Sequence, residues 1–144
     1  MSAISDYKAL IVPAAVWFIA QLLKLIIVLI TEKRLDFGQL TTMGGMPSAH
    51  SATVCSLATT VGKIGGFDSL MFAITVFFAL IVMYDAGGVR QTVGNQSVVL
   101  NRMLDELFKE NPKFQERLKE FIGHSRMEIG AGAVLGIALA WWWA

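Results

Sequence analysis

The sequence predicts an all-α fold, a polytopic membrane helical bundle of about four spanning helices that forms one domain over residues 1–144. Hydrophobic residues make up 55% of the chain and charged residues only 16%, whereas a soluble domain usually carries about 25% charged residues. Four segments have the length or residue pattern of a spanning helix, which needs roughly 17 to 25 mostly apolar residues. A net charge of +1, without a basic stripe, indicates no nucleic-acid partner.

The first two expected spans differ in character. Leu10–Ile30 is apolar except for Gln21 and Lys24. His50–Ile64 is less apolar and carries small or hydroxyl residues at helical spacing, which allow membrane helices to approach closely. These residues are Ser51, Cys55, Ala58, Thr59 and Gly62. We therefore expect the second span to be the central helix of the bundle.

The other two expected spans are more uniformly apolar. Ser69–Tyr84 ends at Asp85, and Met127–Trp143 is interrupted only by Glu128. The last span ends in three tryptophans, which are typical of the membrane interface. Its Gly132 and Gly136 repeat the small-residue pattern of close helix packing.

The polar segment Ala86–Arg126 separates the third and fourth spans. Apolar residues recur in it at intervals of about 3.6, first from Val99 to Phe108 and then from Phe114 to Ile122. This periodicity predicts amphipathic interfacial helices. A small soluble cap over the bundle is the alternative, because periodicity alone does not distinguish the two.

Four spans place both termini on one side and the segments 31–47 and 86–126 on the other. Nine of the twelve Lys and Arg residues fall on that second side. The positive-inside rule then predicts that this second side is cytoplasmic. The expected location is the cell membrane of a bacterium. The nine are Lys33, Arg34, Arg90, Arg102, Lys109, Lys113, Arg117, Lys119 and Arg126.

Ionisable residues within or beside spans are costly and are therefore candidates for function. Apart from Lys24, each lies at the predicted cytoplasmic end of its helix or in a cytoplasmic loop. Each also has a plainer interpretation: Lys24 can snorkel to the interface, the arginines can be membrane anchors, and Glu128 can stabilise a helix start. The candidates are Lys24, Arg34, His50, Asp85, Arg90, His124 and Glu128.

Residues 44–51, GGMPSAHS, combine two glycines, a proline and cap-forming serines before an apolar helix. Proline favours the first helical turn, and Ser48 and Ser51 are good cap residues. A helix start presents free N–H groups and binds anions. With His50 beside it, the segment predicts a phosphate cradle with a proton donor; the alternative is a glycine turn and an ordinary capped helix.

His124 and Glu128 are four residues apart, which places both on one helical face. The carboxylate can hold one imidazole nitrogen protonated and leave the other free to act as a nucleophile or base. A metal site built from His50, Asp85, His124 and Glu128 is the competing interpretation. The surrounding Lys and Arg residues favour phosphate over a metal ion.

Four segments together resemble the type 2 phosphatidic acid phosphatase superfamily. More closely, they resemble its divergent branch, labelled acid phosphatase/vanadium-dependent haloperoxidase-related. The matching segments are GGMPSAHSA (44–52), YDAGGVR (84–90), VVLN (98–101, ending in Asn101) and GHSRMEIGAGAVLG (123–136). The resemblance extends over nearly the whole chain.

The resemblance implies roles for individual residues. Pro47, Ser48 and His50 correspond to the segment that contacts phosphate and supplies a general acid, with Ala49 in the place of a glycine. His124 corresponds to the nucleophile that forms a phosphohistidine, and Glu128 to the Asp that orients it. No metal or cofactor is implied, and related haloperoxidases hold vanadate in this pocket.

The chain also departs from the superfamily pattern. Leu118 stands where an Arg precedes the nucleophile, and Ile27 and Leu35 replace a Lys and a Pro of the first motif. We therefore expect Arg90, with Lys24 and Arg34, to bind the phosphate oxygens, and Asp85 and Asn101 to be possible supporting residues. The common membrane members have six spans and usually face outward, unlike the arrangement expected here.

The sequence thus predicts a metal-independent phosphatase for a lipid phosphate, with membrane lipids around it and a homodimer as a plausible assembly. The expected substrates are polyprenyl diphosphate, phosphatidic acid or phosphatidylglycerophosphate. Two alternatives remain open: a membrane protein that binds or transports an anion or lipid phosphate without chemistry, and a metal-dependent hydrolase.

Overall fold

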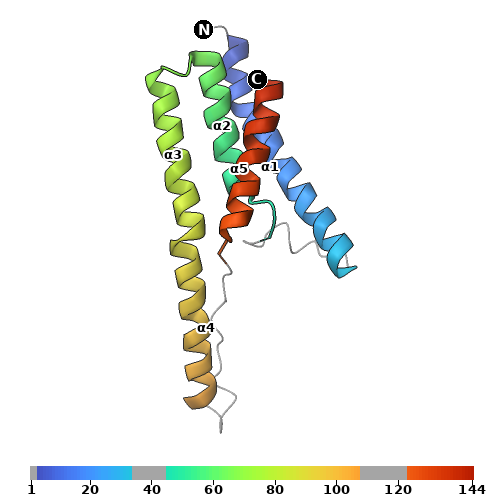
Figure 1. Cartoon of the computed structure of the whole chain (residues 1–144), viewed down its shortest axis with the longest axis vertical. Coiled ribbons are helices and arrows are strands. Elements are labelled where there is room, and N and C mark those ends of the chain that lie inside the picture. The colour runs from blue at the N-terminus through green and yellow to red at the C-terminus, as the bar shows by residue number, and fades with distance from the viewer. Residues whose placement is uncertain (1–2, 34–44, 108–122) are drawn as a thin grey trace.

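The computed structural model describes residues 3–33, 45–107 and 123–144, which form five α-helices and no strand. The helices are α1 (Ala3–Glu32), α2 (Ala49–Gly65), α3 (Leu70–Gly87), α4 (Val89–Leu107) and α5 (Arg126–Trp143). Both termini lie at one end of the bundle (Figure 1), where Lys8 Nζ donates to the carbonyl oxygen of Ala144 over 3.1 Å. The predicted all-α class is confirmed.

The helices of the bundle contain the segments expected to span the membrane, although α1 begins at Ala3, seven residues before the expected Leu10. Ser69 is the N-cap of α3 rather than its first residue. Two stretches are long and apolar enough to cross a membrane, Tyr7–Thr31 and the stretch that begins at Leu70. The outer face of α3 exposes Leu70, Phe77 and Ile81, as a lipid-facing helix does. That α2 and α5 also span stays a prediction.

Helix α2 occupies the centre and packs against α1, α3 and α5 (Figure 1). A Cβ on Gly132 would collide with the carbonyl oxygen of Ser48, and a Cβ on Gly136 with that of Ala52. The backbones of α2 and α5 therefore touch where the glycines lie. Close approach through small residues is how helices associate in lipid, where apolar side chains gain little by leaving the hydrocarbon.

Three helices begin at serine caps, and this fixes where each one starts. Ser48, Ser69 and Ser125 accept hydrogen bonds from the backbone N–H groups of Ser51, Phe72 and Glu128, respectively. A side-chain oxygen at this position satisfies a helical N–H that has no intrahelical partner. Two of these caps, Ser48 and Ser125, lie at the end of the bundle opposite the termini.

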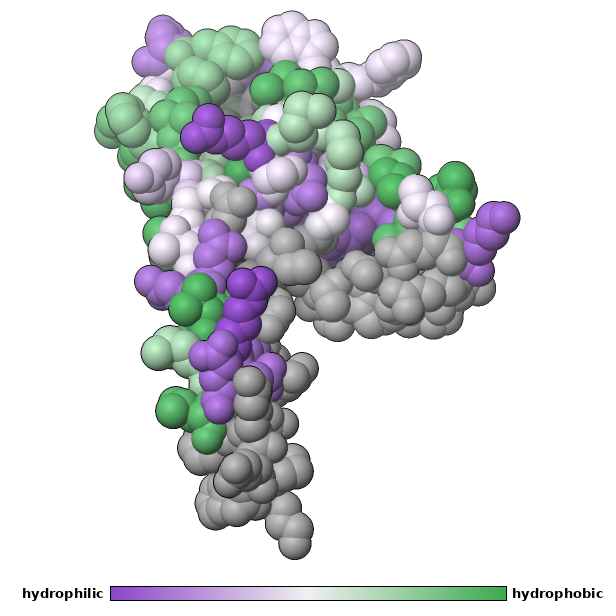
Figure 2. All heavy atoms as spheres, turned by 60° about the horizontal axis from the view of Figure 1, so that its bottom comes forward, coloured by the Kyte–Doolittle hydropathy of each residue, from purple (hydrophilic) through white to green (hydrophobic). Residues whose placement is uncertain are grey.

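Helix α4 follows α3 after Gly88 and extends beyond the bundle in nearly the same direction (Figure 1). It is amphipathic: Val89, Leu100 and Met103 are exposed, and Figure 2 shows green along one edge of α4 beside a purple face. The first of the two apolar stripes is therefore helical from Val99 to Leu107, and Phe108 lies outside the described residues. Its position at a membrane interface and the soluble-cap alternative stay untested, and the second stripe lies outside the described residues.

Candidate functional site

Two segments far apart in the chain bring their histidines together at the end of the bundle opposite the termini. His50 lies in the first turn of α2, and His124 lies just before α5. Their ring centroids are 6.3 Å apart and their planes are inclined by 60°. His50 is exposed, whereas His124 is buried at 4% exposure. A molecule that reaches this pair would therefore approach from the His50 side.

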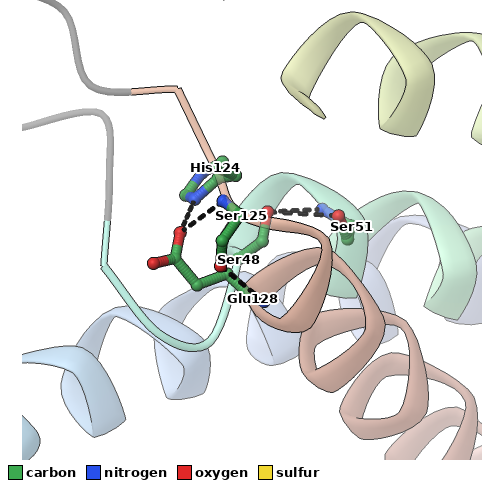
Figure 3. A network of polar contacts seen from close by, with 5 residues as sticks. All are labelled: Ser48, Ser51, His124, Ser125 and Glu128. Carbon is green, nitrogen blue, oxygen red and sulfur yellow. Dashed lines mark hydrogen bonds and ion pairs between the residues drawn. The ribbon is translucent and has the colours of Figure 1, made fainter. Parts of the chain in front are cut away.

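The imidazole of His124 is oriented by Glu128. The Nδ1 atom of His124 lies 2.8 Å from Oε2 of Glu128 (Figure 3). An ionised carboxylate can only accept a hydrogen bond, so Nδ1 carries the proton. In a neutral ring this leaves Nε2 unprotonated, with its lone pair available for bonding. The contact with Glu128 thus leaves Nε2 of His124 able to act as a nucleophile or base.

Glu128 is itself fixed by the start of α5. Its Oε2 atom also accepts a hydrogen bond from the backbone N–H of Ser125 at 3.3 Å, and its own N–H donates to Ser125 Oγ at 3.3 Å. This reciprocal pair is a capping box. Sequence reasoning did not identify Ser125, although the Ser-x-x-Glu spacing of a capping box was readable there. One carboxylate oxygen therefore serves both the helix start and His124.

Ser48 joins the starts of α2 and α5. Its backbone N–H donates to the carbonyl oxygen of Glu128 at 3.1 Å. Its hydroxyl oxygen accepts from the N–H of Ser51 at 3.4 Å and from the Ser51 hydroxyl at 3.1 Å (Figure 3). Ser48 is fully buried. Its side chain therefore holds the helix cap, and the predicted contact with phosphate stays a prediction.

The end of α3 forms another part of the site. The backbone N–H of His124 donates to the carbonyl oxygen of Ala86 at 3.2 Å. A Cβ on the next residue, Gly87, would lie 2.6 Å from Cδ1 of Ile129, so the glycine lets α3 approach α5 closely. Asp85, half-buried, precedes Ala86 in this turn. Sequence reasoning did not identify Ala86, because a backbone carbonyl leaves no signal in residue type.

Lys24 from α1 reaches the same end of the bundle. It is buried at 4% exposure, so it does not extend into solvent. A Cβ on Gly45 would lie 3.0 Å from Cε of Lys24, and Gly45 has φ of +85°, a conformation that favours glycine. Lys24 and Glu128 attract each other electrostatically. Gly45 of the first glycine-rich motif, residues 44–51, thus packs against the buried Lys24 side chain.

Arg34, Arg90 and Asn101 are the remaining residues that the sequence predicted for the site. Arg34 lies outside the described residues, and so does the side chain of Arg90, whose backbone is in the first turn of α4. Asn101 is buried in α4, 15 residues after Ala86. At 1.5 Å per residue it is roughly 20 Å along the helices from the histidines. Asn101 therefore does not join this site.

The metal alternative required His50, Asp85, His124 and Glu128 to converge. Across residues 3–33, 45–107 and 123–144, no group of three or more His, Cys, Asp or Glu side chains is close enough to hold a metal ion. The geometry instead pairs one histidine with a carboxylate and places a second histidine beside it. The four proposed ligands therefore do not form a metal site.

Comparison with known proteins agrees with this combination of motifs. The profile of the Divergent PAP2 family matches residues 5–139. The chain belongs to the Divergent PAP2 family. It is also 38% identical over 150 aligned positions, covering 96% of this chain and 94% of the relative, to the "Uncharacterized membrane protein YuiD" of Bacillus subtilis (strain 168). No solved structure matches the chain.

Membership of the Divergent PAP2 family confirms the resemblance drawn from the four sequence motifs. The matched region contains both histidines, Lys24 and Glu128, so the whole site lies within the family's shared part. The chain is thus a phosphatase-related membrane protein.

Proposed function

We propose that this protein is a metal-independent phosphatase of lipid phosphates, in which His124 is the nucleophile and His50 the general acid. The observation that carries the proposal is the separation of the two rings, 6.3 Å between centroids. An attacking nitrogen stands about 3 Å from phosphorus, and a general acid stands about 3 Å from the leaving oxygen. Two rings at this separation are therefore close enough to act on the same phosphoryl group.

The proposed reaction has two steps. In the first, Nε2 of His124 attacks phosphorus, the bond to the lipid oxygen breaks, and protonated His50 gives its proton to that oxygen. In the second, water attacks the phosphohistidine, His50 takes the proton of the water, and phosphate leaves as the bond to His124 breaks. The Glu128 carboxylate stabilises the positive charge that develops on His124 during attack.

Negative charge on the phosphoryl oxygens requires cations and N–H donors. The buried Lys24 supports this role, since it lies beside Gly45 and interacts with Glu128. We propose Arg90 and Arg34 as further phosphate-binding residues on the basis of sequence alone.

We further propose that α1, α2, α3 and α5 all span the membrane, with the site at the cytoplasmic side. Helices α2 and α5 contain 17 and 18 residues, within the range of about 17 to 25 needed to span. The position of α2 inside the bundle supports this, because a protein-covered span needs fewer apolar residues. Fusions of a periplasm-dependent reporter to the C-terminus should be active, and inactivity there would reverse the orientation.

The reaction is tested by phosphate release from phosphatidic acid, phosphatidylglycerophosphate and polyprenyl diphosphate in detergent. His124→Ala and His50→Ala should each abolish release, while size-exclusion profiles and thermal unfolding stay as in the parent protein. A chelator should leave activity unchanged. Full activity in either histidine variant contradicts the mechanism.

Leu118, where the superfamily pattern has an Arg, supports a second candidate function: a protein that binds or transports a lipid phosphate without hydrolysing it. Phosphate release from the lipid panel distinguishes the phosphatase from the binding protein. Saturable binding of vanadate with no phosphate release from any substrate of the panel would favour the binding protein.

A further inference from the structure

An apolar cavity of about 260 Å³ lies between α2, α3 and α5, outside the histidine site. Cys55, Ala58 and Thr59 of α2 line it on one side, and residues of α3 and α5 line it on the others. Figure 1 shows α2 between these two helices. Helix α3 and helix α5 each pack extensively on α2 but only slightly on each other, which leaves the space between them.

The cavity begins close to the histidine site. Cys55 follows His50 by five residues on α2, a rise of roughly 7 Å along the helix. Met83, which contacts Cys55 across a 3.7 Å sulfur–sulfur distance, lies one turn before Ala86, whose carbonyl binds the N–H of His124. Because α2 and α3 both run from the site into the cavity wall, the near end of the cavity lies within about two helical turns of the level of the histidine pair.

The far end of the cavity is lined by aromatic side chains near the other end of the bundle. Trp141 and Phe67 line it there, and their rings stack with centroids 6.1 Å apart. Trp141 is 17 residues after His124, so it lies roughly 25 Å from the site along α5. The cavity is therefore elongated in the direction that a lipid chain takes below a headgroup.

The walls fit hydrocarbon rather than a polar ligand. Most lining side chains are aliphatic, aromatic or sulfur-containing, and the Thr59 hydroxyl already donates to the carbonyl oxygen of Cys55 at 2.8 Å. A methylene group occupies about as much space as a water molecule, roughly 30 Å³. A cavity of about 260 Å³ thus admits on the order of nine chain carbons, which is part of one chain and not two.

We infer that this cavity holds one hydrocarbon chain of a lipid phosphate whose phosphoryl group lies between His50 and His124. The inference rests on the proposed function and adds to it a means of selecting the substrate. The enzyme would select phosphates by the part of one chain that the cavity admits, about nine carbons, and would tolerate variation beyond that part.

The test compares dodecyl phosphate with butyl phosphate, both below their micelle concentrations in a fixed detergent. Ile137 lines the cavity and is 47% exposed, so Ile137→Trp adds bulk at the rim with little risk to folding. Val134, 69% exposed and outside the cavity on the same helix, provides Val134→Trp as the matched control.

The parent protein should show a kcat/KM for dodecyl phosphate at least tenfold above that for butyl phosphate. Ile137→Trp should lower the value for dodecyl phosphate at least tenfold and leave that for butyl phosphate unchanged, while Val134→Trp changes neither. Equal effects on both substrates, or no effect of Ile137→Trp, would overturn the inference without affecting the proposed reaction.

If the parent protein releases phosphate neither from these two compounds nor from the lipid panel, the proposed function fails, and the cavity is still tested by binding. Cys55 is the single cysteine of the chain and lines the cavity. Dodecyl phosphate should slow its alkylation by a maleimide at least tenfold more than butyl phosphate does. If dodecanol protected Cys55 from alkylation as well as dodecyl phosphate does, any alkyl chain would enter irrespective of its headgroup, and the inference would be overturned. The absence of any protection by dodecyl phosphate would overturn it too.

Discussion

Replacing Glu128 by Gln tests how the carboxylate controls His124. In the parent protein, Oε2 accepts hydrogen bonds from Nδ1 of His124 and from the backbone N–H of Ser125. The Ser125 group is always a donor, so the atom that faces it in Glu128→Gln must be the amide oxygen. The same oxygen then accepts from Nδ1–H. We therefore expect the variant to keep the His124 tautomer and to lose only the negative charge.

The size of the effect follows from the two kinds of hydrogen bond. A neutral bond contributes about 0.5–1.5 kcal/mol and a bond to a charged group about 1.5–3 kcal/mol. The Glu128 side chain is 23% exposed and that of His124 only 5%, so solvent weakens the pair only partly. Losing the charge should raise the activation free energy for the attack of His124 on phosphorus by about 1.4 kcal/mol, which lowers kcat/KM roughly tenfold. Glu128→Ala removes the orienting bond as well and should cost roughly a hundredfold or more.

The assay is phosphate release from the best substrate of the panel, measured for both variants. The tautomer is measured independently by ¹⁵N NMR, which is simple because the chain has two histidines and His50→Gln leaves one. The reasoning is refuted if Glu128→Gln is as inactive as Glu128→Ala, or if its spectrum shows the proton on Nε2. A Glu128→Ala variant with full activity would remove Glu128 from the mechanism.

Three further predictions concern other parts of the site and the bundle. Gly136→Ala drives a methyl group into the backbone carbonyl of Ala52 and should lower the free energy of unfolding by about 1–3 kcal/mol in detergent. Gly130→Ala, with nothing within 4 Å of its Cβ, should raise the free energy of unfolding by about 0.5–1 kcal/mol. If the two variants changed the free energy of unfolding equally, the close contact of α2 and α5 would be contradicted. Ser125→Ala and Ser69→Ala each remove an N-cap and should each cost about 1 kcal/mol in stability, but only Ser125→Ala should reduce phosphate release. A matching loss in Ser69→Ala would mean that the effect is one of folding. Lys24→Met keeps the buried chain and removes the ammonium group, so vanadate should bind roughly tenfold more weakly; unchanged binding would show that Lys24 does not contact the anion.

Much of the fold could be read from the sequence because it depends on local properties. Apolar runs and small-residue faces identified α2, α3 and α5 to within three residues, whereas α1 begins at Ala3, seven residues before the expected Leu10. The Gly132 and Gly136 pair predicted a close helix contact. The spacing of His124 and Glu128 led us to expect the two side chains to meet, and they do. The expected reason was wrong, because His124 precedes the Ser125 N-cap and the contact crosses the start of α5 instead of lying on one helical face. The direction in which α4 leaves the bundle was not predictable, because an amphipathic pattern fixes the face of a helix but not its orientation.

The amino-acid sequence by itself determined the class of the protein, its helices and the residue types of the site, because each follows from hydropathy, periodicity or motif. Only the tertiary structure decided which side chains meet. The distance between His50 and His124, the burial of Lys24 against Gly45 and the contact of the Ala86 carbonyl with His124 depend on how four helices cross. The position of the apolar cavity depends on the same crossings, because helix packing couples residues that no local pattern relates.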